Sequence, residues 1–192
     1  MNKPKSLNKD AYELANDLFQ SGDYAAAFEK YDALTKVGSV ESFLQIGWMF
    51  EKGLGIKKDD RRALGNYNLA AHLGSVQGKH YAARIYLEHR EYQSAMRLLR
   101  EAASNGYGPS SYRLGRIFEK GMGVSPDLAQ ATTWYDKSSR QQHLLASLAL
   151  SRIRMRDGTF QGRIVGFAFV VFGFLRIAAE GFRDPDSDRL RE

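Results

Sequence analysis

Two nearly identical glycine-rich segments contain the residue types in this chain that come closest to a chemical site. Residues 50–56 read FEKGLGI and residues 118–124 read FEKGMGV. Paired glycines can wrap the backbone around a phosphate, but a phosphate-binding loop of that kind follows a strand and ends in Gly-Lys-Ser or Gly-Lys-Thr. Neither segment has that lysine and hydroxyl. The pattern therefore argues against nucleotide binding and favours an architecture that occurs twice.

The other reactive side chains form no catalytic or metal-binding motif. The chain has no cysteine, and its four histidines, His72, His80, His89 and His143, are scattered without ligand spacing. Gly-x-Ser-x-Gly and His-Glu-x-x-His are also absent from the sequence. We therefore expect a protein that is not an enzyme and that holds no cofactor and no metal.

Small residues recur at intervals of 32, 36, 32 and 36 residues. They are Ala15, Gly47, Ala83, Gly115 and Ser151. After each of the first four of these residues comes a second set of three residues that share one helical face. Each set consists of an alanine, a large residue four positions later, and a small or apolar residue three positions after that. These sets are Ala27, Tyr31 and Leu34; Ala63, Tyr67 and Ala70; Ala95, Leu99 and Ala102; and Ala131, Tyr135 and Ser138. Such spacing predicts repeats of two helices each.

The connection between the two helices is predicted to be a long turn in the second and fourth repeats. The two small residues of a repeat are 12 positions apart in the first and third repeats and 16 apart in the others. The additional residues fall in the glycine-rich segments. We expect the glycines there to adopt positive φ, which other residues reach only at a cost. These glycines are Gly53, Gly55, Gly121 and Gly123.

The residues that follow the glycines are expected to close each turn. Ile56 and Val124 are apolar and can fold the loop back onto the core. Ser125, Pro126 and Asp127 have the order typical of an N-cap, a first-turn proline and a first-turn acid of the next helix. The long turns are thus interpreted as structural connections.

Together these features resemble the Sel-one-like repeat, a family of tetratricopeptide-like α-solenoids, over about residues 9–142. The matching residues are Gly47, Phe50, Gly53, Gly55, Ile56, Asp59, Ala63, Tyr67, Ala70, Ala71 and Gly74, and Gly115, Phe118, Gly121, Gly123, Val124, Asp127, Ala131, Trp134 and Tyr135. The resemblance implies an all-α fold, a right-handed α-solenoid of stacked helix-turn-helix repeats with about ten helices. Members of the family typically act as scaffolds for multiprotein assemblies, often in bacterial envelope or signalling contexts.

If the groove geometry of that family applies, two columns of first-helix residues point into a concave groove. The −3 column, three residues before each small residue, contains Tyr12, Leu44, His80, Tyr112 and Leu148. The +1 column, one residue after it, contains Asn16, Trp48, Arg84, Arg116 and Arg152. Arginine suits carboxylates, and aromatic and arginine side chains are favoured anchors at interfaces. We therefore expect an adaptor that binds an acidic peptide or partner protein.

A purely structural interpretation of the same columns remains open. The aromatic side chains can pack between neighbouring first helices, because aromatic stripes at helical spacing usually belong to the core. The arginines can pair with Glu88, Glu119 or Glu51. In that case the columns hold the array together instead of binding a partner.

A strongly apolar segment follows the repeats. Residues 164–175 have no polar side chain, and as a helix they would be about 18 Å long, shorter than a bilayer core of about 30 Å. A terminal solenoid helix needs a polar outer face, which this segment lacks. Phe167, Phe169, Phe172 and Phe174 therefore have three possible locations: buried in the array, at an interface with a partner or second copy through residues 164–179, or in a membrane surface.

We therefore expect four parts: a flexible N-terminus at 1–8, the repeat array at 9–158, a hydrophobic helix at 159–183 and a polar tail at 184–192. The net charge of +6 arises entirely from residues 76–192, since residues 1–75 contain ten basic and ten acidic residues. Nucleic-acid binding is therefore the alternative function, although the repeats favour a protein partner. The start lacks a secretory signal, which predicts a cytoplasmic protein, or one peripheral at the inner membrane face if the apolar segment docks there.

Overall fold

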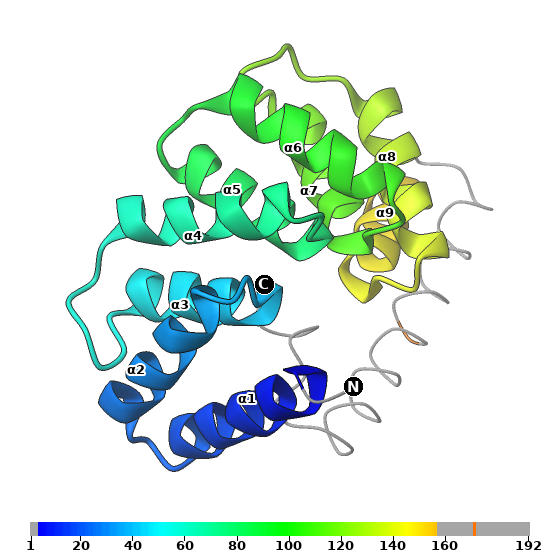
Figure 1. Cartoon of the computed structure of the whole chain (residues 1–192). Helices are drawn as coiled ribbons and strands as arrows, with labels where there is room; N and C mark the ends of the chain where they lie inside the picture. The colour runs from blue at the N-terminus through cyan, green and yellow to red at the C-terminus, as the bar shows by residue number, and fades with distance from the viewer. Residues whose placement is uncertain (1–3, 157–170, 172–192) are drawn as a thin grey trace. The chain divides into compact units, whose positions relative to one another are not determined.

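The computed structural model describes residues 4–156 and Val171 (Figure 1). Over these residues it contains nine α-helices and no strand, which confirms the predicted all-α fold. The helices are α1 (Pro4–Gln20), α2 (Tyr24–Thr35), α3 (Val40–Lys52), α4 (Asp60–His72), α5 (Val76–Glu88), α6 (Tyr92–Ser104), α7 (Gly108–Lys120), α8 (Leu128–Arg140) and α9 (Leu144–Arg156). Helix α1 begins inside the segment predicted to be a flexible N-terminus. The predicted apolar helix at 159–183, with its four phenylalanines, and the tail at 184–192 lie outside the described residues, Val171 excepted.

The paired helices α1 and α2, α3 and α4, and α7 and α8 are antiparallel; a short turn joins the first pair and a longer turn joins each of the other two (Figure 1). In the part of the chain up to Leu98, α1 packs against α2, α3 against α4, and α4 also against α5. In the part from Leu99 onward, α7 packs against α8, and α8 against α9. The boundary between these two compact units falls inside α6. Each unit thus contains the helix-turn-helix repeats that the spacing predicts.

The burial of the aligned residues confirms the predicted register of the repeats. Every small residue of the first column is buried, on α1, α3, α5, α7 and α9. Every alanine that begins the second-helix face is completely buried, and so is the large residue four positions later. These large residues are Tyr31, Tyr67, Leu99 and Tyr135. The small residues leave the space that the large ones occupy, so each repeat has one closely packed face.

Two glycines on first helices allow the closest approach between paired helices. A Cβ atom added to Gly47 would lie 2.6 Å from the ring of Tyr67, and one added to Gly115 would lie 2.5 Å from the ring of Tyr135. Real Cβ atoms essentially never come this close to another heavy atom. Glycine is therefore required sterically at both positions, because the tyrosine ring lies directly on the first helix.

The two long turns have the conformation predicted for their glycines. Gly53 and Gly121 end α3 and α7 in the left-handed region, with φ of 71° and 67°. Gly55 and Gly123 also have positive φ, of 68° and 69°. Each turn is held to the end of the helix before it by a backbone hydrogen bond. The Asp59 N–H donates to the Phe50 carbonyl at 2.9 Å, and the Asp127 N–H donates to the Phe118 carbonyl at 2.8 Å.

The prediction that Ser125 caps α8 is wrong, because Asp127 is the N-cap. Asp127 is extended, with φ of −142°, and its carboxylate accepts a hydrogen bond from the Gln130 N–H at 2.9 Å. Pro126 lies before the helix and contacts the turn at Gly121, where an added Cβ would lie 2.7 Å from the proline ring. The prediction for Val124 is confirmed, since it packs against the core cluster of the second unit.

Candidate functional site

A buried cluster of charged and hydroxyl groups joins three helices of the first unit. Glu51 lies in the last turn of α3, and its side chain is only 8% exposed. The Tyr67 hydroxyl on α4 donates to Glu51 Oε2 at 3.0 Å, and the Arg84 guanidinium on α5 pairs with the same oxygen. Lys52 Nζ lies 2.9 Å from Glu51 Oε1. Two adjacent repeats are therefore tied together through one carboxylate.

The environment keeps the Glu51 carboxylate charged. Burial by itself raises the pKa of Glu51, but the hydrogen bonds and positive charges of Lys52 and Arg84 together outweigh it, so the pKa lies below its ordinary value. Burial and the adjacent Glu51 charge raise the pKa of the Tyr67 hydroxyl. Tyr67 therefore stays protonated and remains a donor to Glu51.

A second cluster of the same residue types occurs in the second unit. The Tyr135 hydroxyl on α8 donates to Glu119 Oε2 at 2.6 Å, and Arg152 on α9 donates to Glu119 Oε1 at 2.6 Å. Burial, followed by the hydrogen bond to Glu119, raises the pKa of Tyr135. The sequence separations are 16 from glutamate to tyrosine and 33 from glutamate to arginine, as in the first cluster. The arrangement is thus a property of the repeat.

The first repeat has aromatic contacts at the corresponding positions. Phe19 takes the place of the glutamate, and its ring centre lies 5.4 Å from that of Trp48 on α3. The Tyr31 hydroxyl donates to Asn16 Oδ1 on α1. Tyr12 packs on the Tyr31 ring at 5.6 Å. Contacts from one repeat to the next are therefore apolar here and ionic at the two clusters.

The +1 column is partly exposed at every position, although the small residue that precedes each member is buried. Asn16, Trp48, Arg84 and Arg116 are half-buried, and Arg152 is exposed. On this column, Arg84 and Arg152 are bound by the glutamates described above. The prediction that these residues contact a partner stays a prediction, and the open alternative of pairing with Glu51 and Glu119 describes their contacts in this structure.

The −3 column divides into accessible and buried positions. Tyr12, Leu44, Tyr112 and Leu148 are half-buried, and His80 on α5 is completely buried. The ring centre of Tyr112 lies 5.6 Å from that of Tyr135 and 4.9 Å from that of His143. A fully buried histidine cannot touch a partner without a change of packing, so the accessible part of this column is aromatic and aliphatic.

The two tyrosine–glutamate bonds were not predicted from the sequence. The available signal was a glutamate four residues after Gly47 and Gly115, together with a tyrosine twenty residues after each glycine. This combination is absent from the first and third repeats, where Phe19 and Leu87 occupy the glutamate position. A comparison of odd and even repeats could therefore have indicated the clusters.

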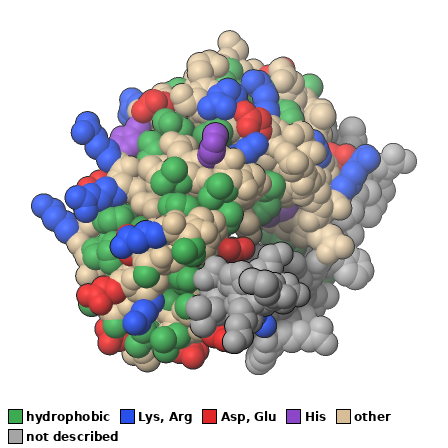
Figure 2. Space-filling view, in the orientation of Figure 1, with side chains coloured by type: hydrophobic (Ala, Val, Ile, Leu, Met, Phe, Trp, Pro, Cys, Tyr) green, Lys and Arg blue, Asp and Glu red, His purple; other side chains and the backbone are tan. Residues whose placement is uncertain are grey.

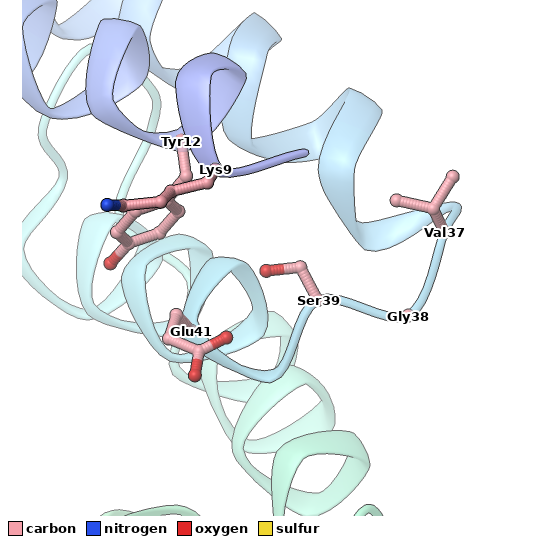
Figure 3. Close-up of a pocket in the computed structure, with 6 residues that line it drawn as sticks. All are labelled: Lys9, Tyr12, Val37, Gly38, Ser39 and Glu41. Atoms are coloured by element: carbon pink, nitrogen blue, oxygen red, sulfur yellow. The ribbon is translucent and has the colours of Figure 1, made fainter. Parts of the chain in front are cut away.

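A surface hollow of about 360 Å³ lies where the start of α1 approaches the turn between α2 and α3 (Figure 3). It is lined by Lys9, Tyr12, Val37, Gly38, Ser39 and Glu41. Figure 3 shows Tyr12 and Lys9 extending from α1 on the side of the hollow where Glu41 lies. Tyr12 is the member of the predicted columns that opens onto this hollow.

The described residues contain no group of histidine, cysteine or carboxylate side chains that could hold a metal ion. Within the same residues, no helix is long and apolar enough to cross a bilayer. On the face drawn in Figure 2, Lys and Arg side chains of the described part are interspersed with Asp and Glu, and no large continuous basic patch is seen.

Paired helices with buried small residues at this period define the tetratricopeptide-like class of α-helical repeat proteins. The Sel1 repeat matches residues 44–75, 90–107 and 108–143. Over these residues the chain is therefore built from Sel1-like repeats. Proteins of this kind are generally non-enzymatic adaptors that bind other proteins.

Solved structures support the fold. A Sel1 repeat protein from Oxalobacter formigenes superposes with a TM-score of 0.79 at 17% identity, over 91% of this chain and 76% of that chain. The protective antigen c5321 from uropathogenic Escherichia coli, described as having an SLR fold, gives a TM-score of 0.74 at 23% identity, over 92% and 42% of the two chains. At these identities the likeness concerns the fold alone.

Two curated relatives are larger proteins. The chain is 26% identical to DAP3-binding cell death enhancer 1 of Rattus norvegicus, over 66% of this chain and 33% of that protein. It is 27% identical to chitin synthase regulatory factor 3 of Schizosaccharomyces pombe, over 72% of this chain and 16% of that protein. The chain thus spans a third or less of the length of either relative.

Proposed function

We propose that this chain is a non-enzymatic adaptor that binds an acidic peptide or partner protein along the first helices of its repeats. The observation that carries the proposal is the burial pattern of the +1 column. All five of its members keep part of their surface exposed, directly beside residues that are buried. Each repeat thereby presents one partly accessible side chain from its first helix.

The side chains available on this surface are of the kinds that dominate binding energy at interfaces. Tyr12, Trp48 and Tyr112 contribute half-buried aromatic rings, and Arg116 contributes a half-buried guanidinium. Tyrosine, tryptophan and arginine are the residue types most often found at energetic hot spots. Because a partly buried ring is already ordered, it binds a partner with little further loss of side-chain entropy.

The names of the two larger relatives also support binding and regulation as the function. One relative is named for binding DAP3, and the other is named as a regulatory factor of chitin synthase. Neither name describes a catalytic activity. Because the chain spans only part of these proteins, the adaptor role of this chain remains a proposal that depends on the repeat surface.

Site-specific photo-crosslinking tests the surface. A benzophenone amino acid replaces Trp48 on α3 or Tyr112 on α7, where it substitutes one aromatic side chain for another. The matched controls are Arg61 on α4 and Ala129 on α8, which are exposed on second helices. We expect the same partner protein to be crosslinked in cells from the two first-helix positions and from neither control position.

Two results would contradict the proposal. The first is equal crosslinking from Arg61 and Ala129, which would mean that the second helices form the interface. The second is the absence of any crosslinked protein at Trp48 and Tyr112 while the variants remain folded by circular dichroism. Either result would mean that the first-helix columns hold the repeats together and are not the binding surface.

Docking through the apolar segment 159–183 is a further part of the proposed function, supported by its composition alone. Flotation with liposomes and size-exclusion chromatography of the full chain and of a form lacking 159–183 distinguish a membrane from a second copy. Loss of flotation in the shortened form would support membrane docking, and loss of a dimer would support self-association. Unchanged behaviour in both measurements would eliminate this part of the proposal.

A further inference from the structure

The three arginines of the +1 column differ in their counter-charges. Arg84 is bound by Glu51, and Arg152 is bound by Glu119, each from 33 residues earlier in the sequence. At the equivalent repeat position before Arg116, the sequence has Leu87. The repeat therefore supplies an acid to two of the arginines and an apolar residue to the third.

Arg116 consequently has an unusual environment on α7. Its side chain is half-buried, and no residue of 4–156 makes a hydrogen bond or ion pair with it. A partly desolvated guanidinium has lost some hydration without gaining a carboxylate in exchange. A negatively charged group that arrives at this position recovers that loss, which makes Arg116 the most receptive cation of the column.

We propose that Arg116 recognises a carboxylate of the partner, which supplies the counter-charge that Glu51 and Glu119 supply to the other two arginines. This inference rests on the proposed function, and it names the acidic side chain of a protein segment as the chemistry recognised. A guanidinium offers two parallel N–H donors that match the two oxygens of a carboxylate. The partner thus completes the ionic pattern of the repeats.

The same comparison explains why the other two arginines contribute little to recognition. Arg84 is only 19% exposed and is held by a carboxylate that is 8% exposed. Arg152 is 62% exposed, but an incoming carboxylate there approaches the negative charge of Glu119 as well. Repulsion from the resident glutamate offsets the attraction of the arginine at both places.

The test uses the full chain and a fluorescein-labelled oligoglutamate peptide, with an oligoglutamine peptide of equal length as the uncharged comparison. Fluorescence anisotropy at low ionic strength measures the affinity. We expect Arg116→Gln to weaken oligoglutamate binding by about tenfold or more, because one charge-assisted contact is lost. Arg116→Lys should be intermediate, since it keeps the charge but loses the planar fork.

Arg152→Gln is the matched control, because it removes the same charge from an exposed position that already has an acid. It should change the affinity by less than about threefold, as expected for an exposed pair. Arg116→Gln should also leave the thermal unfolding midpoint close to that of the parent, since Arg116 makes no internal hydrogen bond among the described residues. Equal losses in both variants would overturn the inference, because general electrostatic attraction would then explain them.

Other outcomes also decide the question. Failure of the parent chain to prefer oligoglutamate over oligoglutamine overturns the inference, and so does unchanged binding by Arg116→Gln. Tighter binding of a labelled single-stranded DNA, with a steep salt dependence that Arg116→Gln reduces, would assign Arg116 to phosphates instead. In each of these cases crosslinking through Trp48 and Tyr112 still reports on the proposed function independently.

Discussion

The clusters around Glu51 and Glu119 have the same residues and the same sequence spacing, but they differ in burial. In the first, Arg84 is 19% and Glu51 is 8% exposed; in the second, Arg152 is 62% and Glu119 is 21% exposed. Coulomb attraction grows as solvent is excluded, and so does the cost of leaving one charge alone. One repeat pattern therefore produces a structural tie in the first unit and a weak surface pair in the second.

Additional contacts account for the stronger confinement of the first cluster. Lys52 adds a second cation at Glu51, and the Arg84 guanidinium lies over the ring of Tyr81, 5.4 Å from its centre. Lys120, which corresponds to Lys52, forms no ion pair within residues 4–156. Neighbouring residues thus decide how tightly a shared motif is held.

The largest expected effect is a difference between Arg84→Ala and Arg152→Ala. Arg84→Ala leaves a buried carboxylate short of a partner and should lower the free energy of unfolding of the first unit by about 2–3 kcal/mol, with Lys52 limiting the loss. Arg152→Ala should cost the second unit only about 0.5 kcal/mol. Trp48 and Trp134 lie one in each unit, so urea titrations of variants that keep a single tryptophan measure the units separately.

Equal losses from these two substitutions would show that burial does not distinguish the clusters. Arg84→Met is the control for packing, since it retains an unbranched side chain without the charge. If Arg84→Met were as stable as the parent, the ion pair would make no net contribution to the free energy of unfolding. Replacement of a buried ion pair by apolar groups is often neutral in this way.

A smaller effect is expected at the glycines beneath the two tyrosines, and here the repeats should agree. Gly47→Ala and Gly115→Ala each place a Cβ within 2.6 Å of a buried ring. We expect each to cost up to about 2 kcal/mol, because an overpacking cost of about 1–3 kcal/mol is only partly offset by the gain in helix propensity of about 1 kcal/mol. Denaturant titration followed by the tryptophan of the same unit measures both.

Gly65→Ala provides the matched control for helix propensity. Gly65 lies on α4 with nothing within 4 Å of an added Cβ, so the substitution should stabilise the chain by about 1 kcal/mol. Unequal losses at Gly47 and Gly115 would mean that the repeats differ in backbone packing as well as in burial of charge.

The pH dependence of stability should reflect the lowered pKa of Glu51. Folding lowers this pKa from its ordinary value of 4.5, so the unfolded chain binds the proton first as the pH falls. The stabilisation is therefore complete above the unfolded value and is lost as the pH falls from 4.5 through the lowered folded value. Glu51→Gln should reduce the slope of unfolding free energy against pH in this window. An unchanged slope, followed through Trp48, would contradict the assignment.

Residue periodicity predicted the repeats because close packing requires small and large residues at fixed positions. Gly47 and Tyr67, for example, could be aligned from spacing alone, and the structure brings them into contact. The Tyr67–Glu51 bond was not predicted, because periodicity gives the face of a helix but does not show which side chain on it reaches a neighbouring helix.

The cap of α8 was misassigned to Ser125 for a similar reason. Several possible capping residues precede that helix, and the position of the turn decides which of them is the N-cap. Exposure of the +1 column likewise depends on packing that one sequence does not specify.

The smallest expected effect is a difference in salt sensitivity between the two arginines. Screening acts strongly on solvent-exposed charges and weakly on buried ones, since the Debye length is about 3 Å at 1 M salt and about 10 Å at 0.1 M. The cost of Arg152→Ala, a few tenths of a kcal/mol, should disappear as sodium chloride is raised through this range, whereas most of the cost of Arg84→Ala should remain. The same single-tryptophan titrations at the two salt concentrations measure this difference.

If both costs declined in parallel, water and ions would reach Glu51 as readily as Glu119, and the confinement inferred for the first cluster would be wrong. If only the cost at Arg152 declined, the second cluster would be the one in which salt screens the ion pair.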